Sequence, residues 1–446
     1  MGVIKKILIN IILIFACGTG YGATTLYVWT NSPNPGTPYN AWTNAARTIQ
    51  TAVDATGAGD TILVTNGVYD TGGKVTPSYA LTNRVCITKS ITVRSFNNDP
   101  TNTIIQGAPD PVTGGCGTNA VRCVHMNNSG ASLIGFTLTG GYTMTTPTGG
   151  ESDYQNRPGG GVLFTAGTVS NCLILRNTAS FRGGGAMLRG GGTMNNCTLT
   201  ANLTLDGGGG VGFAFGPPGG IMNDCTLNCN TSSANGGGVL FYHAGTMNRC
   251  TLSNNVALGS GGGATFYYGT QPQATMNNCL LVGNRATGSG GGVYFWVDAS
   301  SMMTMNNCLL IGNKSGNAYF NSCGTMNNCT LAAGDYGAYM KNGGAMTNCI
   351  VWGNTNYDIS SAGTVSYTCS REVTPGEGNI TNNPLFVDTN SGNYRITSGS
   401  PCVNAGTNQA WMTNAVDMDG RMRIRYGTVD MGAYERLHNG TIYGFH

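Results

Sequence analysis

One short motif recurs eight times in the middle of the chain and limits the folds that the chain can adopt. In each repeat an Asn-Cys-like pair precedes an aliphatic residue, and successive cysteines lie 20 to 29 residues apart. These cysteines are Cys172, Cys197, Cys225, Cys250, Cys279, Cys308, Cys329 and Cys349. A period in this range is typical of a solenoid, in which each repeat buries its apolar face only against its neighbours.

Other positions repeat together with the cysteine. Methionine lies three residues earlier in seven of the eight repeats, and an aliphatic residue lies two residues later, which predicts a short strand with one buried face. Asparagine lies five residues after the cysteine in seven repeats, Gly334 being the exception: Asn177, Asn202, Asn230, Asn255, Asn284, Asn313 and Asn354. Because asparagine tolerates left-handed backbone and can bond to its own kind one coil away, we expect a stacked asparagine ladder.

A glycine triplet begins a second apolar strand in the first five repeats, at Gly183, Gly208, Gly236, Gly261 and Gly290. Each repeat therefore supplies a glycine-led strand, a Thr-Met-Asn strand and a Cys-x-Leu strand. A helical solenoid is excluded because Gly-Gly-Gly and Asn-Asn clusters would break its helices. We predict an all-β protein, a right-handed parallel β-helix with three strands per coil, whose regular coils span residues 169–356.

The N-terminal part, residues 23–168, is expected to contain a helical cap and the first coils. Ala45–Val53 has the pattern of a short amphipathic helix with Asn44 as its N-cap. Strands are expected at Asp60–Val64, Ile91–Val93 and Thr103–Ile105. The order of a helix, Gly59-Asp60-Thr61-Ile62 and Gly67-Val68-Tyr69 resembles the start of pectate-lyase-like β-helix proteins, which implies the same fold.

The C-terminal part, residues 357–446, is expected to be a capping module, since an open stack of strands needs caps to remain a monomer. It contains four motifs in a fixed order: Asn383-Pro384-Leu385-Phe386, Ser400-Pro401-Cys402-Val403-Asn404-Ala405-Gly406, Asp417-Met418-Asp419-Gly420 and Asp430-Met431-Gly432-Ala433-Tyr434-Glu435. They resemble the C-terminal module of the bacterial "choice-of-anchor Q" proteins, which are exported β-helices. This resemblance implies a place at the cell surface.

Residues 1–22 have the parts of a secretory signal peptide: Lys5 and Lys6, an apolar stretch at Ile7–Phe15, and small residues before a cleavage point at Ala23. We therefore expect a secreted or cell-surface protein. The alternative is a lipoprotein, because Ile14-Phe15-Ala16-Cys17 approximates a lipobox that would place the lipid on Cys17. No later segment is apolar over the ~20 residues that a transmembrane helix needs.

The charge of the chain argues against a nucleic-acid partner. Without Lys5 and Lys6, the 22 basic and 19 acidic residues leave a formal charge of +1, and no basic run is present. The ladder cysteines are expected to be free buried thiols, whereas Cys116 and Cys123 are the expected disulfide. The four histidines do not accompany a Cys-x-x-Cys motif, so no metal site and no cofactor are expected.

A catalytic site is only weakly indicated by the sequence. The acidic residues of the repeats, Asp206, Asp224, Asp298 and Asp335, fall in different positions of distant repeats. The best candidates for a catalytic cleft are Glu151, Asp153, Arg157, Arg176, Arg182 and Arg189. The alternative is that these six residues form a solvated rim. The tail acids Asp417, Asp419 and Asp430 are expected to order the cap, because a single Asp-x-Asp-Gly is a weak calcium motif.

Aromatic residues alternate with buried positions in the glycine-led strands and are expected to face outwards. They are Tyr242, Tyr267, Tyr294, Trp296, Tyr319 and Tyr339. Flat rings at coil spacing suit stacking against sugars, but a loop or the C-terminal module could cover them instead. We expect a non-catalytic, glycan-binding, adhesive or structural protein whose partner is an extracellular polysaccharide or a host or cell-surface glycan. The alternative is a polysaccharide lyase or glycoside hydrolase, for which calcium would be a possible cofactor.

Overall fold

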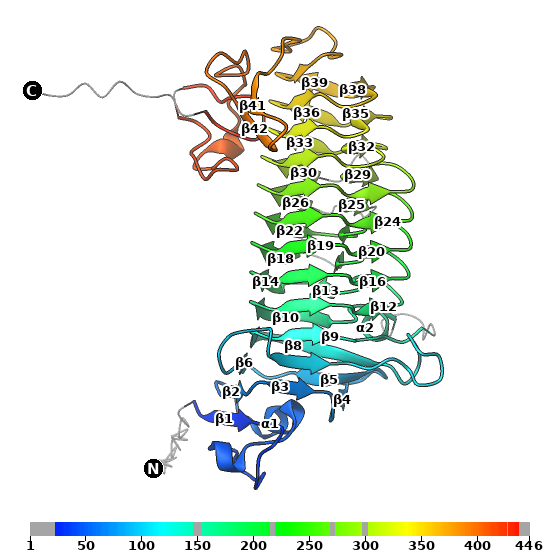
Figure 1. The fold of residues 1–446 in the computed structure, drawn as a ribbon, viewed down its shortest axis with the longest axis vertical. Coiled ribbons are helices and arrows are strands. Elements are labelled where there is room, and N and C mark those ends of the chain that lie inside the picture. The colour runs from blue at the N-terminus through cyan, green and yellow to red at the C-terminus, as the bar shows by residue number, and fades with distance from the viewer. Residues whose placement is uncertain are drawn as a thin grey trace, which may run out of the picture.

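The structure is a computed structural model that describes residues 23–145, 153–214, 219–267, 273–296, 302–425 and 427–436. The chain winds into a right-handed parallel β-helix, as the repeat predicts, and Figure 1 shows its coils stacked along one axis. The signal-peptide residues 1–22 and the lipid-acceptor candidate Cys17 lie outside the described residues. No helix in the described ranges is long and apolar enough to cross a membrane.

The strands fall into four columns, three of which run along most of the solenoid. The first column contains the glycine-led strands and their equivalents in the other coils: β5 (Thr82–Ile87), β13 (Ala186–Arg189), β17 (Val211–Ala214), β21 (Val239–Phe241), β25 (Ala264–Tyr267), β29 (Val293–Trp296), β32 (Ala318–Phe320), β35 (Tyr336–Met340) and β38 (Tyr357–Ser361). The short strand β4 (Lys74–Val75) pairs antiparallel with β5. The second column contains the Thr-Met-Asn strands: β1 (Thr25–Val28), β2 (Thr61–Val64), β6 (Thr92–Ser95), β14 (Thr193–Asn195), β18 (Gly220–Asn223), β22 (Gly245–Asn248), β26 (Gln273–Asn277), β30 (Met302–Asn306), β33 (Thr325–Asn327), β36 (Ala345–Thr347) and β39 (Thr364–Ser366). Two long strands, β8 (Val121–Ile134) and β10 (Val162–Ser170), run through both columns and join them into one sheet.

The third column contains the Cys-x-Leu strands: β3 (Gly67–Tyr69), β7 (Thr103–Gln106), β9 (Thr137–Thr139), β11 (Leu173–Leu175), β15 (Thr198–Thr200), β19 (Thr226–Asn228), β23 (Thr251–Ser253), β27 (Leu280–Val282), β31 (Leu309–Ile311), β34 (Thr330–Ala332), β37 (Ile350–Trp352) and β40 (Cys369–Ser370). A short fourth column, which the sequence did not indicate, follows the asparagine ladder: β12 (Thr178–Ala179), β16 (Leu203–Thr204), β20 (Thr231–Ser232), β24 (Val256–Ala257) and β28 (Arg285–Ala286). The coils therefore extend beyond residue 356, as far as Ser370.

Identical side chains stack in files inside the coils. The methionine, cysteine and aliphatic positions of the eight repeats are each at most 2% exposed. A fourth file contains Phe213, Phe241, Phe266, Phe295 and Phe320, whose neighbouring ring centroids lie 4.6–4.9 Å apart and whose planes differ by at most 9°. The adjacent rungs of Cys197, Cys225 and Cys250 confirm the register that the sequence predicts.

The asparagine ladder is also confirmed. Asn255, for example, donates its side-chain Nδ2 to Asn284 Oδ1 at 3.0 Å and to the backbone carbonyl of Leu227 at 2.9 Å. At the exceptional position, Gly334, the ladder is completed by Asn317, which bonds to Asn313 on one side and to Asn354 on the other. The left-handed conformation, however, belongs to the residue before each ladder asparagine, such as Asn254 with φ of 54°, because the amide itself must point inwards.

The glycine triplets meet two separate geometric demands. The first glycine of each triplet is left-handed, with φ between 65° and 72°. At the second and third positions the next coil approaches so closely that a side chain would collide with backbone: a Cβ at Gly237 would lie 2.5 Å from the carbonyl oxygen of Gly262. The triplet therefore permits both the turn and the coil-to-coil contact.

The N-terminal cap differs in detail from the predicted helix. Residues Trp42–Asn44 form a single 3₁₀ turn, η1, and the helix α1 begins only at Ile49 and ends at Ala55. Its N-cap is Thr48, whose hydroxyl accepts the backbone N–H of Thr51 at 3.2 Å, so the predicted N-cap Asn44 is wrong. Asn44 and Thr48 both have a side-chain oxygen that can cap a helix. The helix begins after Thr48 because Ala45 and Ala46 are fully buried in contacts with the rest of the fold.

The predicted disulfide is wrong, because Cys116 and Cys123 are both free thiols with different contacts. The Sγ of Cys123 donates to the carbonyl oxygen of Thr139 at 3.2 Å, whereas that of Cys116 lies 3.8 Å from the hydroxyl of Thr143. The eight ladder cysteines are free and buried, as predicted.

The C-terminal module, residues 371–436, both covers the last coil and folds back along the solenoid. Residues 371–380 pass over the end, where the backbone N–H of Ser370 donates to Ile380 at 3.1 Å. The rest, with β41 (Phe386–Asp388), β42 (Asn393–Ile396) and the 3₁₀ turn η3 (Ala410–Met412), lies beside the upper coils (Figure 1). Its contacts are with the outer side of the third column, where Leu309, Ala332 and Tyr394 form a buried cluster.

Candidate functional site

A band of aromatic rings covers part of the outer side of the first column. The strand alternation buries Val293 and Phe295 and turns Tyr294 outwards, and the last residue of the strand, Trp296, also faces out. In-register pairing then places Tyr319 and Tyr339 in the same file as Tyr294, and Tyr267 beside Trp296. All six predicted aromatic residues are therefore brought together, and we call this set, with the two rings described below, the aromatic band.

The rings of the band contact one another from coil to coil. The stacked pairs are Tyr242 and Tyr267 (centroids 5.7 Å apart), Tyr294 and Tyr319 (5.4 Å), and Tyr319 and Tyr339 (5.0 Å). Trp296 meets Tyr267 edge to face at 5.0 Å and Tyr294 at 6.3 Å. These contacts hold the rings in fixed orientations, which lowers the entropic cost of receiving a flat ligand.

Sequence reasoning missed two further rings, Tyr336 and Tyr357. They are paired in register at the start of β35 and β38, with centroids 5.3 Å apart, and each also lies 6.4 Å from the ring of Tyr339. These two coils lack the glycine triplet that marked the strand in earlier repeats. The sequence feature that could have indicated these two rings is a tyrosine directly after a polar residue, Asp335 in one coil and Asn356 in the next.

The band combines exposed ring surface with neutral hydroxyl groups. Trp296 is 41% exposed, and Tyr319 and Tyr339 are half-buried, whereas Tyr294 is only 9% exposed. Burial raises the pKa of Tyr294, of Tyr319 and of Tyr357, the last to about 12. Their hydroxyl groups therefore remain protonated at neutral pH and can both donate and accept hydrogen bonds.

A small polar pocket of about 170 Å³ lies at the N-terminal end of the band. Tyr242, Tyr267, Arg182 and Asp206 are among the residues that line it. The guanidinium carbon of Arg182 lies 3.4 Å from the ring centroid of Tyr242, and its Nε lies 3.5 Å from the carboxylate of Asp206. Arg182 is only 8% exposed, yet its Nη1 has no hydrogen-bond partner among the described residues. A donor is therefore buried beside the pocket and unsatisfied.

This pocket connects the two sets of residues that the sequence singled out separately. Arg182 also stacks on Phe181 at 4.5 Å, and the same ring faces Arg157 at 5.2 Å. Arg157 forms an ion pair with Asp153 at 3.8 Å. Arg189 completes the group by lying 5.8 Å above the ring of Tyr154. Four of the six catalytic candidates, Asp153, Arg157, Arg182 and Arg189, are thus close together, but mainly around aromatic rings.

Of the other two catalytic candidates, only Arg176 belongs to the described residues. Arg176 lies at the exposed left-handed turn after β11, with φ of 54°, and no contact with the group is seen in the described part of the chain. Glu151 lies outside the described residues. Since the acidic members of the group that the structure describes are Asp153 and Asp206, both paired with arginine, the arrangement resembles a binding surface more than a pair of facing carboxyl groups.

Buried Arg122 holds the short helix α2 (Asp153–Asn156) in place over the first coils. Its guanidinium group is fully buried and donates to the backbone carbonyls of Gly159, Gln155 and Pro158 at 2.6–2.9 Å, and to Asn83 Oδ1 at 2.9 Å. Through these bonds Arg122 positions the segment that contains Asp153 and Arg157. Arg122 is thus a positioning residue that sequence reasoning missed, because nothing in its local sequence marks it.

The C-terminal module does not cover the band in the described parts of the chain. Its contacts are with the third column, whereas the band lies on the first. Three segments that follow first-column strands, residues 215–218, 268–272 and 297–301, lie outside the described residues. Metal ligands are not grouped near the band: within the described ranges, no three His, Cys, Asp or Glu side chains lie close enough to hold an ion.

Comparisons with known proteins agree with the fold. No protein-family model matches the chain, and no curated protein matches it. The pectate lyase Pel9A superimposes with a TM-score of 0.50 at 16% identity, over 94% of this chain and 97% of that one. A rhamnogalacturonan lyase gives 0.44 at 13% identity, over 90% and 95% of the two chains. The A-module of the Azotobacter vinelandii mannuronan C-5 epimerase AlgE6 gives 0.38 at 13% identity, over 74% and 95%. At this identity the likeness to Pel9A shows the fold alone, the parallel β-helix.

Proposed function

We propose that this protein binds an extracellular polysaccharide along its aromatic band and does not cleave it. The observation that carries the proposal is the continuous contact of the eight rings, from Tyr242 to Tyr357, on the outer side of consecutive coils. Pyranose rings present apolar C–H faces that pack on aromatic rings, while their hydroxyl groups reach the polar groups at the edges. A linear polymer could therefore lie along the solenoid axis and contact several coils at once.

The pocket beside Tyr242 supports the same proposal. Arg182 offers donors and Asp206 offers acceptors, so together they match a sugar hydroxyl group, which does both. The buried and unsatisfied Nη1 of Arg182 would gain a partner when a hydroxyl or carboxylate oxygen enters. One end of the band would then orient the chain, and the rings would supply most of the contact area.

Export of the protein is part of this proposal. The secretory-type sequence of residues 1–22 supports it, and cell-surface attachment would follow if the C-terminal part anchors as its sequence motifs suggest. The resulting role is adhesive or structural at a glycan-rich surface, with a cell-surface glycan as an equivalent partner. The pectate lyase Pel9A, which shares the fold, acts on a polysaccharide by its name, and this is consistent with a polysaccharide ligand here.

Retention on polysaccharides tests the proposal. We expect Tyr294→Ala/Trp296→Ala to weaken binding at least tenfold in affinity electrophoresis against a panel of neutral and uronic-acid polysaccharides, because two of the central rings are lost. Phe96→Ala is the matched control, since Phe96 is an aromatic residue of similar exposure (49%) on the N-terminal coils. Unchanged retention of the double variant would remove the proposal.

The same panel decides between binding and catalysis. We expect the length of each polysaccharide to remain unchanged after incubation with the wild-type protein, both with and without calcium. A new unsaturated end group would establish a lyase, and a new reducing end would establish a glycoside hydrolase. In either case Arg182→Ala should abolish the reaction, because Arg182 is the buried cation beside the pocket.

A further inference from the structure

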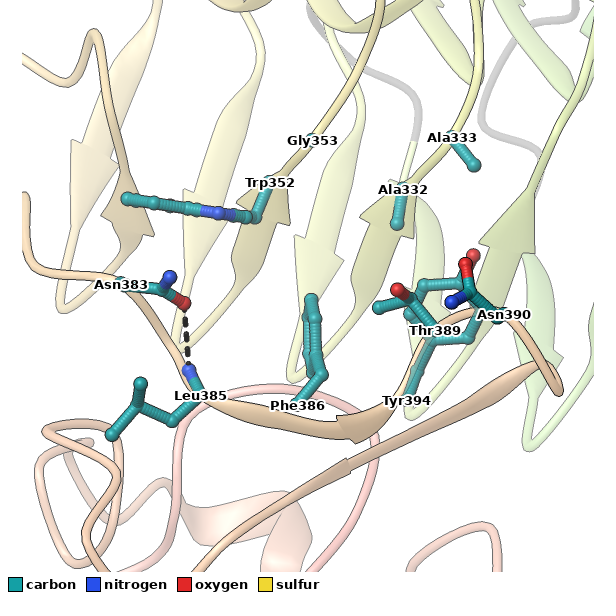
Figure 2. Close-up of a pocket in the computed structure, with 10 residues that line it drawn as sticks. All are labelled: Ala332, Ala333, Trp352, Gly353, Asn383, Leu385, Phe386, Thr389, Asn390 and Tyr394. Carbon is teal, nitrogen blue, oxygen red and sulfur yellow. Dashed lines mark hydrogen bonds between the residues drawn. The ribbon is translucent and has the colours of Figure 1, made fainter.

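A second concave site lies on another side of the molecule, where the C-terminal module meets the third column. Its volume is about 500 Å³, within the usual range of small-molecule sites. One wall is the end of β37 in the solenoid, and the other is the hairpin of β41 and β42 with the residues that precede it. Figure 2 shows the groove between these two elements, with the indole of Trp352 on the solenoid side. We call this site the seam groove.

The seam groove exists because large and small residues alternate along one file of the third column. Trp352 pairs in register with Ala332, and both Ala332 and its neighbour Ala333 are too small to fill the space beside the indole. Gly353, directly after the tryptophan, is left-handed with φ of 73° and leaves the rim open. The hairpin brings Phe386 and Tyr394, whose rings meet edge to face at 5.3 Å, and these close the floor.

The polar groups of the groove are uncharged and partly unpaired. They belong to Asn383, Thr389 and Asn390, and Figure 2 shows all three on the module side. Asn383 Oδ1 accepts the backbone N–H of Leu385 at 2.9 Å, which fixes the orientation of the amide. Its Nδ2, the amide of Asn390 and the hydroxyl of Thr389 have no protein partner among the described residues.

This chemistry selects a class of ligand. Among the residues that the structure describes, no Asp, Glu, Lys, Arg or His side chain lines the groove, so neither a metal ion nor a phosphate group would find its usual partners there. An apolar ligand would displace water from the exposed amides and the hydroxyl without replacing its hydrogen bonds. A neutral ligand with an apolar face and a rim of hydroxyl groups satisfies both walls, because an indole face packs on C–H groups while amides donate to and accept from hydroxyl groups.

We propose that the seam groove is a second carbohydrate site, which takes one or two neutral sugar residues against Trp352. It is separate from the aromatic band in position and in chemistry, and it does not depend on the function proposed for the band. Because the groove is built from both the solenoid and the module, ligand binding would also tie the module to the coils, and the module would be more stable in the bound state.

Saturation-transfer NMR on a protein without a working band tests this inference. The probes are methyl β-glucopyranoside, methyl α-mannopyranoside and cellobiose, with glucuronate as a charged comparison. In the full-length Tyr294→Ala/Trp296→Ala background, we expect transfer to the C–H protons of at least one neutral probe, and little transfer to glucuronate. Adding Trp352→Ala should reduce that transfer at least fivefold.

Two further variants keep the test independent of folding. Thr389→Trp places a bulky side chain on an exposed turn at the rim and should block the groove without disturbing the coils. Trp411→Phe is the matched control, because its indole bonds to Gln409 Oε1 at 2.6 Å in the module and does not line the groove. Transfer that survives both Trp352→Ala and Thr389→Trp would overturn the proposal, as would the absence of transfer to every neutral probe.

Discussion

At the scale of single residues, asparagine has three different structural roles in the coils. The ladder asparagines bond inside the coil, and a second set, such as Asn223 and Asn248, forms a half-buried outer ladder along the Thr-Met-Asn strands. A third set, in the Asn-Cys pairs, is left-handed, and in the upper coils it holds the C-terminal module: Asn307 Nδ2 donates to Val416 and Asn328 Nδ2 to Asp430. Position in the repeat, and not residue type, decides the role.

The two ladders should differ in their contribution to stability. Asn255→Ala removes the partner of Asn230 and leaves the buried carbonyl of Leu227 unsatisfied, so we expect a loss of about 3 kcal/mol. Asn248→Ala, in the outer ladder, exposes its partners to water and should cost about 1 kcal/mol. Urea unfolding followed by circular dichroism measures the free energy of unfolding of each variant. Equal losses would contradict the prediction that the inner ladder stabilises the fold more than the outer ladder.

The ladder thiols should be inert in the folded protein. Cys197 is 1% exposed, its Sγ donates to the carbonyl of Asn195 at 3.3 Å, and burial raises the pKa of this thiol well above its usual value. We expect native Cys197 to resist iodoacetamide for hours, whereas exposed Cys229 reacts within minutes. Mass spectrometry of native and urea-unfolded samples gives the answer, with Cys229→Ser as the control. Rapid labelling of Cys197 in the native protein would show that the coil opens locally.

These residue roles could be predicted from the sequence wherever one residue type recurs at one spacing. The cysteine, methionine and asparagine files were readable because each coil repeats them. Asn317 was not, since it fills the gap at Gly334 from the preceding repeat and breaks the spacing. Likewise the pairing of Arg182 with Asp206 and Tyr242 joins residues of three successive repeats, and no spacing rule predicts such a contact.

At the scale of elements, the C-terminal module is held together by a buried cluster of charges. The side chain of Arg423 is fully buried. It lies 3.0 Å from the carboxylate of Glu435 and donates a hydrogen bond to the backbone carbonyl of Asp430 at 3.0 Å. Asp417 accepts backbone N–H groups of Asp419 and Arg421, which supports a structural role for this acid. Burial raises the pKa of Glu435 to about 8, although Arg423 opposes the shift.

The module should therefore lose stability as the pH rises. Between the usual pKa of 4.5 and about 8, the folded state holds a proton on Glu435 that the unfolded state has released. The free energy of unfolding then falls with increasing pH in this window, by at most about 1.4 kcal/mol for each unit of pH. Below the window both states are protonated and the effect disappears.

Limited proteolysis of the module at pH 5, 7 and 9 measures this dependence. We expect faster cleavage between 371 and 436 at pH 9 than at pH 5, and Glu435→Gln should flatten the profile because glutamine does not titrate. Glu377→Gln, in the exposed loop over the last coil, is the control and should keep the slope. A profile that rises in stability towards pH 9 would contradict the raised pKa of Glu435.

Elements were predictable where they repeat and less so where tertiary contacts decide. The strands near Thr61, Thr92 and Thr103 begin within one residue of expectation, but α1 begins four residues later than the predicted helix. The side of the solenoid to which the module docks was not predictable, because the docking asparagines look the same as every other Asn-Cys pair.

At the scale of the whole molecule, the coils behave as interchangeable units. Residues 225–249 form one coil, and their removal would join Asp224 to Cys250 in the relation that Asp224 now has to Cys225. We expect the deletion variant to fold, with the same circular dichroism per residue and a solenoid about 4.8 Å shorter by small-angle scattering. The control is a deletion of about half a coil, residues 225–237, which joins Asp224 to Gly238 and removes the strands β19 and β20 from the coil. We expect this variant to misfold, because its register no longer matches the neighbouring coils.

The amide ladder has a direction, and its last member shows why the stack stops. Each Nδ2 donates towards the C-terminal end until Asn354 reaches Asp358, whose other carboxylate oxygen is taken by Arg371 at 2.6 Å. The carboxylate of Asp358 has no N–H to donate to a further asparagine. Arg371 occupies the position that the next amide of the ladder would take. The amide column therefore ends inside the molecule at an acceptor, and a further amide placed against this end would find no donor in the column to bind its oxygen.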